Sequence, residues 1–510
     1  MKILFYSSHA LEANSLAVLL DEAIECLQDA NNEVLFVTCS GEARPCDSNP
    51  EQSVIRCWEC RLSSWLLLSQ IEHPNFKHRE LSSFNIKGAR KNHLSEFDFT
   101  SITDLKSITY NNINIGLGVV SSYVSMTRNL EPLMEKANRE YFNAALKASA
   151  ILVELSSNIV ELYNPDLVYL FNGRYSSMRP VLEVASNRDL KTCVLECTFS
   201  STREIQRKVK FFNALPHDID NNSKIIEENW NSWSLASNKE AIAAEFYERR
   251  KRGEMASDSV YIGHQDRSAL PPNWDNSKRN FVIFNSSEDE FFCVGESFDK
   301  YKLFDSQIEG IVYLLKKARN KPDIHYYLRI HPNLKYIKFK YHTALASLLE
   351  GYDNITVLPA DSAISTYKLL ENCEKVFVFG STVGVEATYW GKPVILLGGA
   401  FYLHLNVAYY PKDLSELDEL IVEVIECKPR LGALKYALFI FGERGEPFKF
   451  INYNYYIKRI CGKSLTLPRC YMVLNSMIPY IVLAGVFRML NCISHLVFKL
   501  VKLKRLLVER

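Results

Sequence analysis

The sequence carries almost no net charge. Its 510 residues include 60 lysines and arginines against 59 aspartates and glutamates, which gives a formal net charge of +1. Proteins that attract nucleic acid over long distances usually have a strongly basic surface. The balance of charge therefore gives no reason to expect a nucleic-acid partner.

A secretory signal and a disulfide framework are also missing from the sequence. Residues 1–6 form a short apolar run that meets polar residues at once, without the length and flanks of a signal. The 13 cysteines are scattered, and some, such as Cys193 and Cys373, lie inside apolar segments. In a chain of this size we expect reduced thiols and a cytoplasmic protein.

The chain is too long for one ordinary hydrophobic core, so we expect two domains and an appendage. In the second half, short apolar runs alternate with helical segments such as 308–315 and 343–349. Such alternation is typical of a parallel sheet covered by helices on both faces. The predicted strands are 281–284, 326–330, 355–358, 376–379 and 394–397.

The first half repeats this pattern less regularly, with predicted strands at 3–6, 34–39, 167–171 and 192–195. A segment with two prolines, residues 268–275, is the best candidate for a linker. We therefore divide the chain into four parts. These are a first α/β domain at 1–265, a linker at 266–280, a second α/β domain at 281–430 and C-terminal helices at 431–510.

The most informative motif is the loop Gly380-Ser381-Thr382, which lies between a predicted buried strand and a short helix. Such a loop can bring backbone N–H groups, two hydroxyls and a helix N-terminus to one point, which attracts an anion such as phosphate. Ser381 and Thr382 are also common helix caps, and both roles can hold together. Glu386 lies one turn into the helix, where its carboxylate can accept hydrogen bonds from sugar hydroxyls.

Other polar residues follow the predicted strand 326–330. Ligands of open parallel sheets bind at the carboxyl ends of the strands. His331 stands there with Asn333, and Arg329 adds positive charge. A lone histidine more often satisfies loop carbonyls, but the Gly380 loop on the same sheet edge favours phosphate binding here. Asp305 is predicted to cap the helix at 308–315.

In the first half, Asn172 and Arg174 follow a predicted strand, with Arg179 nearby. Two guanidinium groups at a strand end suit an anionic substrate, although a surface ion pair is an equal alternative. His9 and Glu196 also stand at the ends of predicted strands. They are our candidates for the catalytic base.

Four cysteines in the first half raise the question of a metal. Cys57 and Cys60 form a tight pair, and Cys39 and Cys46 precede them at a loose spacing. Zinc sites use such pairs. Because Cys39 is predicted to end a strand, we expect ordinary thiols and no metal.

The last segment, residues 469–510, is apolar and basic, with Glu509 as its only acid. Its apolar run is near the shortest length that spans a bilayer and contains Asn475, Ser476 and Pro479. A helix that lies in the membrane interface fits better. The alternative is a helix packed across the two domains.

The second half resembles the bacterial capsule polysaccharide biosynthesis proteins, which include the retaining Kdo transferases of capsule assembly. It is more distantly similar to polysialyltransferases and CDP-glycerol glycerophosphotransferases, which share a His-Pro element. The resemblance covers about residues 280–410 and extends to the first half only in general architecture. It rests on His331-Pro332, on Asp305 and Gln307, and on the run from Ser381 to Ala387 followed by Gly391-Lys392-Pro393.

The resemblance implies a GT-B fold, in which two Rossmann-like domains face a cleft. The first domain would bind a glycan or glycolipid acceptor and the second a nucleotide-sugar donor, without metal or cofactor. His331 and the Ser381-Thr382 loop would hold the donor phosphate, and Glu386 would contact the ribose or base. Two features depart from the family: Arg329-Ile330 replaces the usual lysine, and the first half has no recognisable acidic motif.

We therefore expect a glycosyltransferase of surface-polysaccharide synthesis at the inner face of the bacterial cytoplasmic membrane. Three alternatives remain open. They are a CDP-glycerol-type glycerophosphotransferase, a nucleotide-sugar 2-epimerase of the same fold and a non-catalytic partner in capsule assembly or export.

Overall fold

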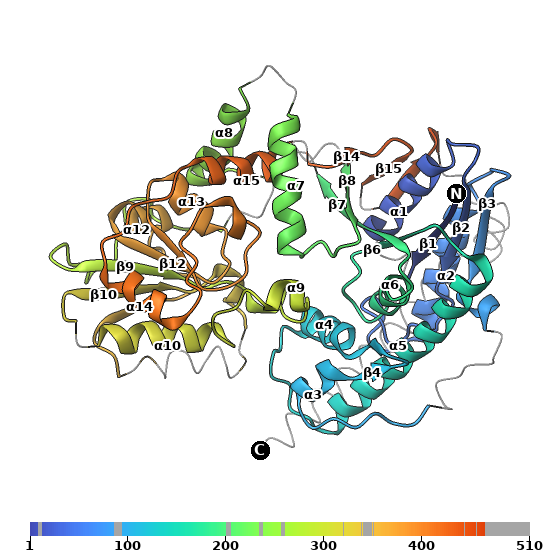
Figure 1. Ribbon diagram of the computed structural model, residues 1–510, viewed down its shortest axis with the longest axis horizontal. Coiled ribbons are helices and arrows are strands. Elements are labelled where there is room, and N and C mark those ends of the chain that lie inside the picture. Colours follow the sequence, from blue (N-terminus) through green and yellow to red (C-terminus); the bar gives the residue numbers. More distant parts are fainter. Residues whose placement is uncertain are drawn as a thin grey trace, which may run out of the picture.

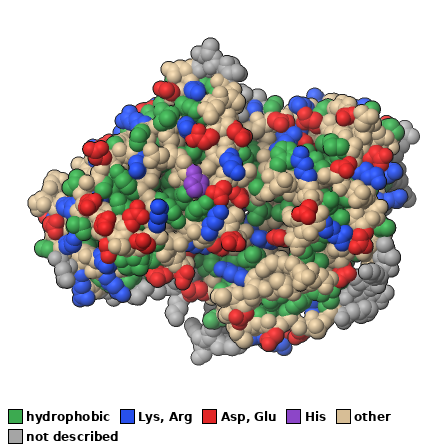
Figure 2. Space-filling view, viewed as in Figure 1, with side chains coloured by type: hydrophobic (Ala, Val, Ile, Leu, Met, Phe, Trp, Pro, Cys, Tyr) green, Lys and Arg blue, Asp and Glu red, His purple; other side chains and the backbone are tan. Residues whose placement is uncertain are grey.

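The computed structural model describes residues 1–464 apart from 9–12, 86–93, 200–205, 234–237, 257–260, 320, 338, 340–348, 350, 443 and 455. The described residues form two α/β domains that lie side by side, the first on the right and the second on the left of Figure 1. His9, most of the helix predicted at 343–349 and the basic tail at 469–510 lie outside the described residues. Figure 2 shows acidic and basic side chains interspersed over the face in view, in keeping with the balanced composition.

The first domain is built on a seven-stranded sheet of order β14-β8-β7-β6-β1-β2-β3. The strands from β7 to β3 are parallel, and β8 and β14 are antiparallel additions at one edge. The parallel strands at the centre are buried on both faces, which explains their unbroken apolar sequences. The bounds are β1 (Lys2–Ser7), β2 (Glu33–Thr38), β3 (Phe76–Glu80), β6 (Leu167–Phe171), β7 (Lys191–Phe199), β8 (Gln206–Phe212) and β14 (Glu446–Pro447).

The second domain has a five-stranded, fully parallel sheet of order β11-β10-β9-β12-β13. Alternate residues of each strand enter different cores, for example Phe281 and Ile283 on one face and Val282 and Phe284 on the other. All five predicted strands of this half are present. Their bounds are β9 (Arg279–Phe284), β10 (Ile324–Arg329), β11 (Ile355–Leu358), β12 (Lys375–Val378) and β13 (Val394–Leu396).

Helices cover both sheets. Those of the first half are α1 (Ala13–Cys26), α2 (Val54–Leu68), α3 (Ile102–Ser107), α4 (Gly116–Thr127), α5 (Lys136–Tyr163), α6 (Arg179–Ser186), α7 (Ile219–Ser232) and α8 (Lys239–Arg252). Those of the second half are α9 (Glu296–Asp299), α10 (Gln307–Ala318), α12 (Thr366–Asn372), α13 (Val383–Tyr389), α14 (Leu414–Val422) and α15 (Leu431–Phe441). Within the described residues, none of the helices has the length and apolar character needed to cross a membrane.

Helices α7 and α8 precede the expected linker, yet they pack in the second domain. Trp230 and Tyr247 belong to the same hydrophobic core as Val282 of the second sheet, and α8 lies against α15. The proline segment 268–275 also packs there, since Trp274 stacks on Tyr327 with ring centroids 4.4 Å apart. The chain therefore passes from the first domain to the second before α7 begins. Local sequence could not show this, because it depends on contacts between distant segments.

The chain returns to the first domain after α15. Strand β14 pairs with β8, and the three-stranded sheet of β15 (Ile451–Asn454), β16 (Tyr456–Ile460) and β17 (Lys463–Ser464) packs on α1. The prediction of helices throughout 431–510 is therefore wrong for 446–464, where the described residues form strands. This returning segment adds a strand to the open edge of the first sheet.

A buried ionic cluster fixes the returning segment. The Asp21 carboxylate accepts hydrogen bonds at 2.7–3.0 Å from the backbone N–H groups of residues 449–451. Its other oxygen pairs at 2.9 Å with Nζ of the fully buried Lys208, which also contacts Glu22 and Glu25. Removing one partner would leave a charge buried without compensation, so these groups hold the C-terminal strands firmly to the first domain.

Candidate active site

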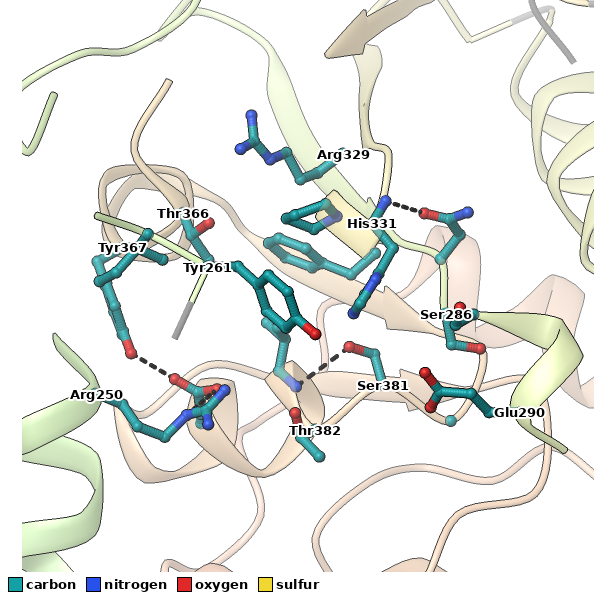
Figure 3. Close-up of a pocket in the computed structure, with 18 of the residues that line it drawn as sticks. Arg250, Tyr261, Ser286, Glu290, Arg329, His331, Thr366, Tyr367, Ser381 and Thr382 are labelled. Atoms are coloured by element: carbon teal, nitrogen blue, oxygen red, sulfur yellow. Dashed lines mark hydrogen bonds and ion pairs between the residues drawn. The ribbon is translucent and has the colours of Figure 1, made fainter. Parts of the chain in front are cut away.

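A cavity of about 390 Å³ opens at the carboxyl edge of the second sheet. Figure 3 shows its polar side chains converging from separate elements. Segments that follow β9, β10 and β12 form one side, and residues of α8, α12 and the 261–265 segment form the other. The lining includes Ser286, Glu290, Arg329, His331, Gly380, Ser381, Thr382 and Glu386, together with Arg250, Tyr261, Gln265, Thr366 and Tyr367.

The Gly380 loop is fixed by close packing. Gly380 has φ +96°, and a Cβ at this position would lie 2.5 Å from the Gly399 carbonyl oxygen, so only glycine fits. The Ser381 carbonyl accepts a hydrogen bond from the buried Tyr402 hydroxyl at 2.6 Å. Ser381 Oγ accepts from the Val383 N–H at 3.3 Å. Thr382 occupies the cap position of α13 without a side-chain cap bond.

His331 presents an uncharged N–H to the cavity. Its Nδ1 accepts a hydrogen bond from the Asn333 N–H at 3.2 Å, which places the proton on Nε2. The backbone N–H of His331 donates to Asn285 Oδ1 at 2.7 Å, and the imidazole ring points toward Ser381 (Figure 3). Burial, together with the charge of Arg128, lowers the pKa of His331 to about 4. The imidazole is therefore neutral at pH 7.

Arg329 supplies a buried positive charge to the same cavity. Only 2% of this residue is exposed. Nη2 donates to the Ser362 carbonyl at 3.0 Å, but Nη1 is buried without a hydrogen-bond partner among the described residues. Burial lowers the pKa of Arg329 to about 10, so the group stays charged at neutral pH. A buried cation with an unused donor favours an anionic ligand.

Glu386 is buried, and both of its oxygens have partners. Oε1 accepts from Arg250 Nε at 3.0 Å and Oε2 from the Tyr367 hydroxyl at 2.5 Å. These bonds connect α8, α12 and α13 along one wall of the cavity (Figure 3). The predicted contact of Glu386 with a ribose or base stays a prediction, and the structure gives this residue a supporting role in addition.

Asn333 does not line the cavity, unlike the other predicted donor-binding residues. Its side chain donates to Glu290 Oε1 at 3.1 Å, and its carbonyl accepts from Arg128 Nη1 at 2.9 Å. Arg128, at the left-handed C-terminal cap of α4, also pairs with Asp289. No local pattern in the sequence marks Arg128, because this residue reaches the site from the other domain. The acidic run of residues 288–290, a few residues after the predicted strand 281–284, was a usable signal for Glu290.

Two of the predicted anion-binding residues of the first domain, Arg174 and Arg179, contact the second domain. Arg174 Nη1 donates to the Glu290 carbonyl, and Arg179 Nη1 donates to the Val294 carbonyl at 3.0 Å. Both arginines are buried, and Arg179 Nε also pairs with Glu183 Oε1 at 3.1 Å. Asn172 donates to Glu196 at 2.8 Å. A role of these residues in binding an acceptor stays a prediction.

Glu196 lies inside β7 and not at a strand end as predicted. Antiparallel pairing with β8 extends β7 to Phe199, beyond the apolar run that marked its start. Burial raises the pKa of Glu196 to about 7. The carboxylate is not among the residues that line the cavity of the second domain.

The predicted cap of the helix at 308–315 is wrong by one residue. The helix begins at Gln307, and Ser306 Oγ caps it by accepting from the Glu309 N–H. Serine competes well with aspartate at this position, so propensity alone did not decide between them. Gln307 fixes the loop that follows β9. Its side-chain oxygen accepts from the Ser286 N–H and its side-chain nitrogen donates to the Ser286 hydroxyl, both at 2.9 Å.

Cys39, Cys46, Cys57 and Cys60 surround a small cavity in the first domain. Within the described residues, only Glu22, Glu25 and Glu446 bring three candidate ligand atoms within 4.8 Å of one another, and Lys208 and Lys210 pair with that group. Burial raises the pKa of Cys39 to about 12, which favours the thiol over the metal-binding thiolate. The absence of bound zinc stays a prediction.

A comparison with protein families matches residues 296–409 to the family described as "Capsule polysaccharide biosynthesis protein". This match confirms the resemblance found in the sequence for that part of the second domain. No curated protein matches the chain. The two domains, each with parallel strands at the centre of its sheet, confirm the predicted α/β architecture in the described residues.

Among solved structures, the chain is similar to KpsC, a β-Kdo 2,4 transferase of Thermosulfurimonas dismutans (16% identity, 54% of this chain and 79% of that chain, TM-score 0.33). It is also similar to the β-Kdo 2,7 transferase of the same organism (14% identity, 56% and 88%, TM-score 0.30). A third is the UDP-GlcNAc 2-epimerase of Neisseria meningitidis (12% identity, 86% and 99%, TM-score 0.24). At these identities and TM-scores the similarities carry no argument for function.

Proposed function

We propose that this protein is a glycosyltransferase that moves a sugar from a nucleotide-sugar donor to a growing surface polysaccharide or glycolipid. The observation that carries the proposal is a pair of hydrogen-bond donors in one cavity. They are the neutral Nε2–H of His331 and the Nη1 of buried Arg329, which has no partner among the described residues. The family match over residues 296–409 supports a place in capsule polysaccharide synthesis.

The arrangement suits the departure of a nucleotide phosphate. As the bond to the sugar breaks, negative charge develops on the leaving phosphate oxygen. Arg329 and His331, with the Ser381-Thr382 loop beside them, would stabilise that charge through preformed hydrogen bonds. In the proposed reaction these groups do the work that a cation does elsewhere, so the proposal includes no metal or cofactor.

The acceptor would approach from the first domain, whose arginines already form hydrogen bonds to the loop at 285–295. Closure of the two domains would exclude water and align the acceptor hydroxyl with the donor sugar. A role of His9 or Glu196 as the catalytic base stays a prediction from the sequence.

We also propose that the protein associates with the inner face of the cytoplasmic membrane, where lipid-linked acceptors are assembled. Helix α2 supports this, because five of its large apolar side chains are exposed, including Trp58 (67%) and Trp65 (49%). On a helix of 3.6 residues per turn these positions fall within an arc of about 100°. Tryptophans on such a face are typical of interfacial helices. The stripe consists of Val54, Ile55, Trp58, Leu62 and Trp65.

A thermal-shift screen with CMP-, UDP-, GDP- and CDP-linked donors tests the proposed function. A ligand at 100 times its dissociation constant stabilises the protein by about 2.7 kcal/mol, which such a screen detects. A stabilising donor should then lose its sugar only when an acceptor or water takes it. Interconversion of the bound sugar without transfer would support an epimerase, and no binding of any donor would contradict the proposal.

A further inference from the structure

Two of the residues that line the cavity carry a carboxylate, Glu386 and Glu290. The Glu386 oxygens are engaged by Arg250 and Tyr367. In Glu290, Oε1 accepts from Asn333 Nδ2 at 3.1 Å, whereas Oε2 has no hydrogen-bond partner in the described part of the chain. Glu290 therefore offers the cavity a carboxylate oxygen that is free to take a proton.

The position of Glu290 is set from both domains. It stands in the loop after β9, with its carboxylate beside Ser286 and directed toward the space near Ser381 (Figure 3). Its carbonyl oxygen accepts from Arg174 of the first domain at 2.5 Å. Glu290 thus lies where the donor cavity meets the domain from which an acceptor would approach.

The neighbouring acids have other partners. Asp289 pairs with Arg128 at 2.7 Å and also accepts from Ser287. Glu288 lines a separate cavity of about 40 Å³ with Lys302 and Gln307. Of the three consecutive acids, Glu290 alone lines the main cavity.

Resting on the proposed function, we propose that Glu290 is the general base of the transfer and is therefore a catalytic residue. Its Oε2 takes the proton of the acceptor hydroxyl while that oxygen forms the bond to the anomeric carbon. The bond from the anomeric carbon to the phosphate oxygen breaks, and its electron pair leaves with the nucleotide. Asn333 holds the carboxylate in place during this step.

The electrostatic surroundings suit this role. Loss of solvation and the charge of Asp289 raise the pKa of Glu290, while Arg128, Asn333 and Arg174 oppose the shift. A carboxylate with a raised pKa is a stronger base in its ionised form. Turnover should therefore rise with pH through the pKa of Glu290 and then level off.

The test compares Glu290→Gln with the wild-type full chain. Glutamine keeps the size of the side chain and its contact with Asn333 but cannot accept the proton. Turnover is measured as nucleotide release from the donor that binds in the thermal-shift screen, with and without a detergent extract of membrane glycolipids. Glu296→Gln, an exposed acid outside the cavity, is the matched control.

We expect Glu290→Gln to lose turnover by about 10²–10⁴-fold, with donor affinity unchanged and with loss of the acidic limb of the pH profile. The control should match the wild type. Retained turnover, or a lower turnover with the same acidic limb, would overturn the catalytic role while leaving the proposed function intact. A wild-type protein that binds no nucleotide, or releases none under any of these conditions, would contradict both.

Discussion

Arg128 of the first domain donates to Asp289 of the second, with Nε 2.7 Å from Oδ2 and Nη2 3.0 Å from Oδ1. The residues are 161 positions apart in sequence. The same guanidinium bonds to Ser287 and to Asn333, and the side chain of Asp289 is only 8% exposed. Arg128 therefore fixes two segments at once. One is the loop after β9, which carries the proposed base Glu290, and the other is the turn after His331, which is proposed to donate a hydrogen bond to the phosphate.

Arg128→Met should destabilise the protein, because the buried Asp289 carboxylate would lose its cationic partner and, in the described structure, keep only the hydrogen bond from Ser287. Breaking a buried pair in this way typically costs about 3–5 kcal/mol. The free energy of unfolding from urea denaturation measures the loss. Lys136→Met, which breaks an exposed pair with Glu140, should change stability by no more than about 0.5 kcal/mol. Equal effects of the two variants would show that the Arg128 contacts contribute little.

His331→Ala and the double variant Ser381→Ala/Thr382→Ala should both weaken nucleotide-sugar binding. Losing a hydrogen bond to a charged group costs roughly 1.5–3 kcal/mol, which corresponds to about a ten- to hundred-fold change in affinity. Titration calorimetry provides the measurement, with circular dichroism to confirm folding. His404→Ala, outside the cavity, is the control. Wild-type affinity in both site variants would refute the assignment of the phosphate site.

The free energy of unfolding should decrease in acid, in part because His331 has a lowered pKa in the folded protein. Its pKa is lowered to about 4 in the folded protein, against about 6.5 in an unfolded chain. Between these values the unfolded state binds the proton first, so folding stability decreases as pH falls from about 6.5 toward 4 and the loss then levels off. Urea denaturation at several pH values should give a shallower decrease for His331→Asn than for the wild type. Parallel curves would mean that the histidine does not titrate as described.

Purified protein should contain no stoichiometric zinc. The cysteines around the small first-domain cavity do not form a trio at metal-binding distances in the described structure, and burial keeps Cys39 and Cys46 protonated by raising their pKa values. Elemental analysis checks this directly. About one zinc per chain, lost when Cys57 and Cys60 are replaced by serine, would establish a metal site instead.

Membrane association should depend on α2 and on the basic tail. Each lysine or arginine near an anionic surface contributes about 1 kcal/mol, so high salt should release part of the protein. In flotation with anionic liposomes, Trp58→Ala/Trp65→Ala and a chain ending at residue 464 should each bind less than the full chain. Donor binding should be unchanged in both. Failure of the full chain to bind anionic liposomes at low salt would contradict the membrane proposal.

The strands of the second domain were predictable because each is a short, continuous apolar run. The run at 355–358 coincides with β11, and the others differ from the observed strands by a few residues at most. The edge of the sheet that lines the cavity was also predictable from these strands, since Arg329, His331 and Ser381 stand at or just after their carboxyl ends. The helix cap was less certain because Asp305 and Ser306 have similar propensities, and the structure uses Ser306.

The sequence by itself determined the parallel sheet of the second domain, the central strands of the first sheet, the Gly380-Ser381-Thr382 loop and the polar edge around His331, because apolar periodicity and turn chemistry are local. The tertiary structure decided which domain receives α7 and α8, how the chain returns through β14, and that Arg128 and Arg174 meet the loop of Glu290. These outcomes depend on burial, hydrogen bonding and charge pairing between residues that are far apart in the sequence, which no local pattern records.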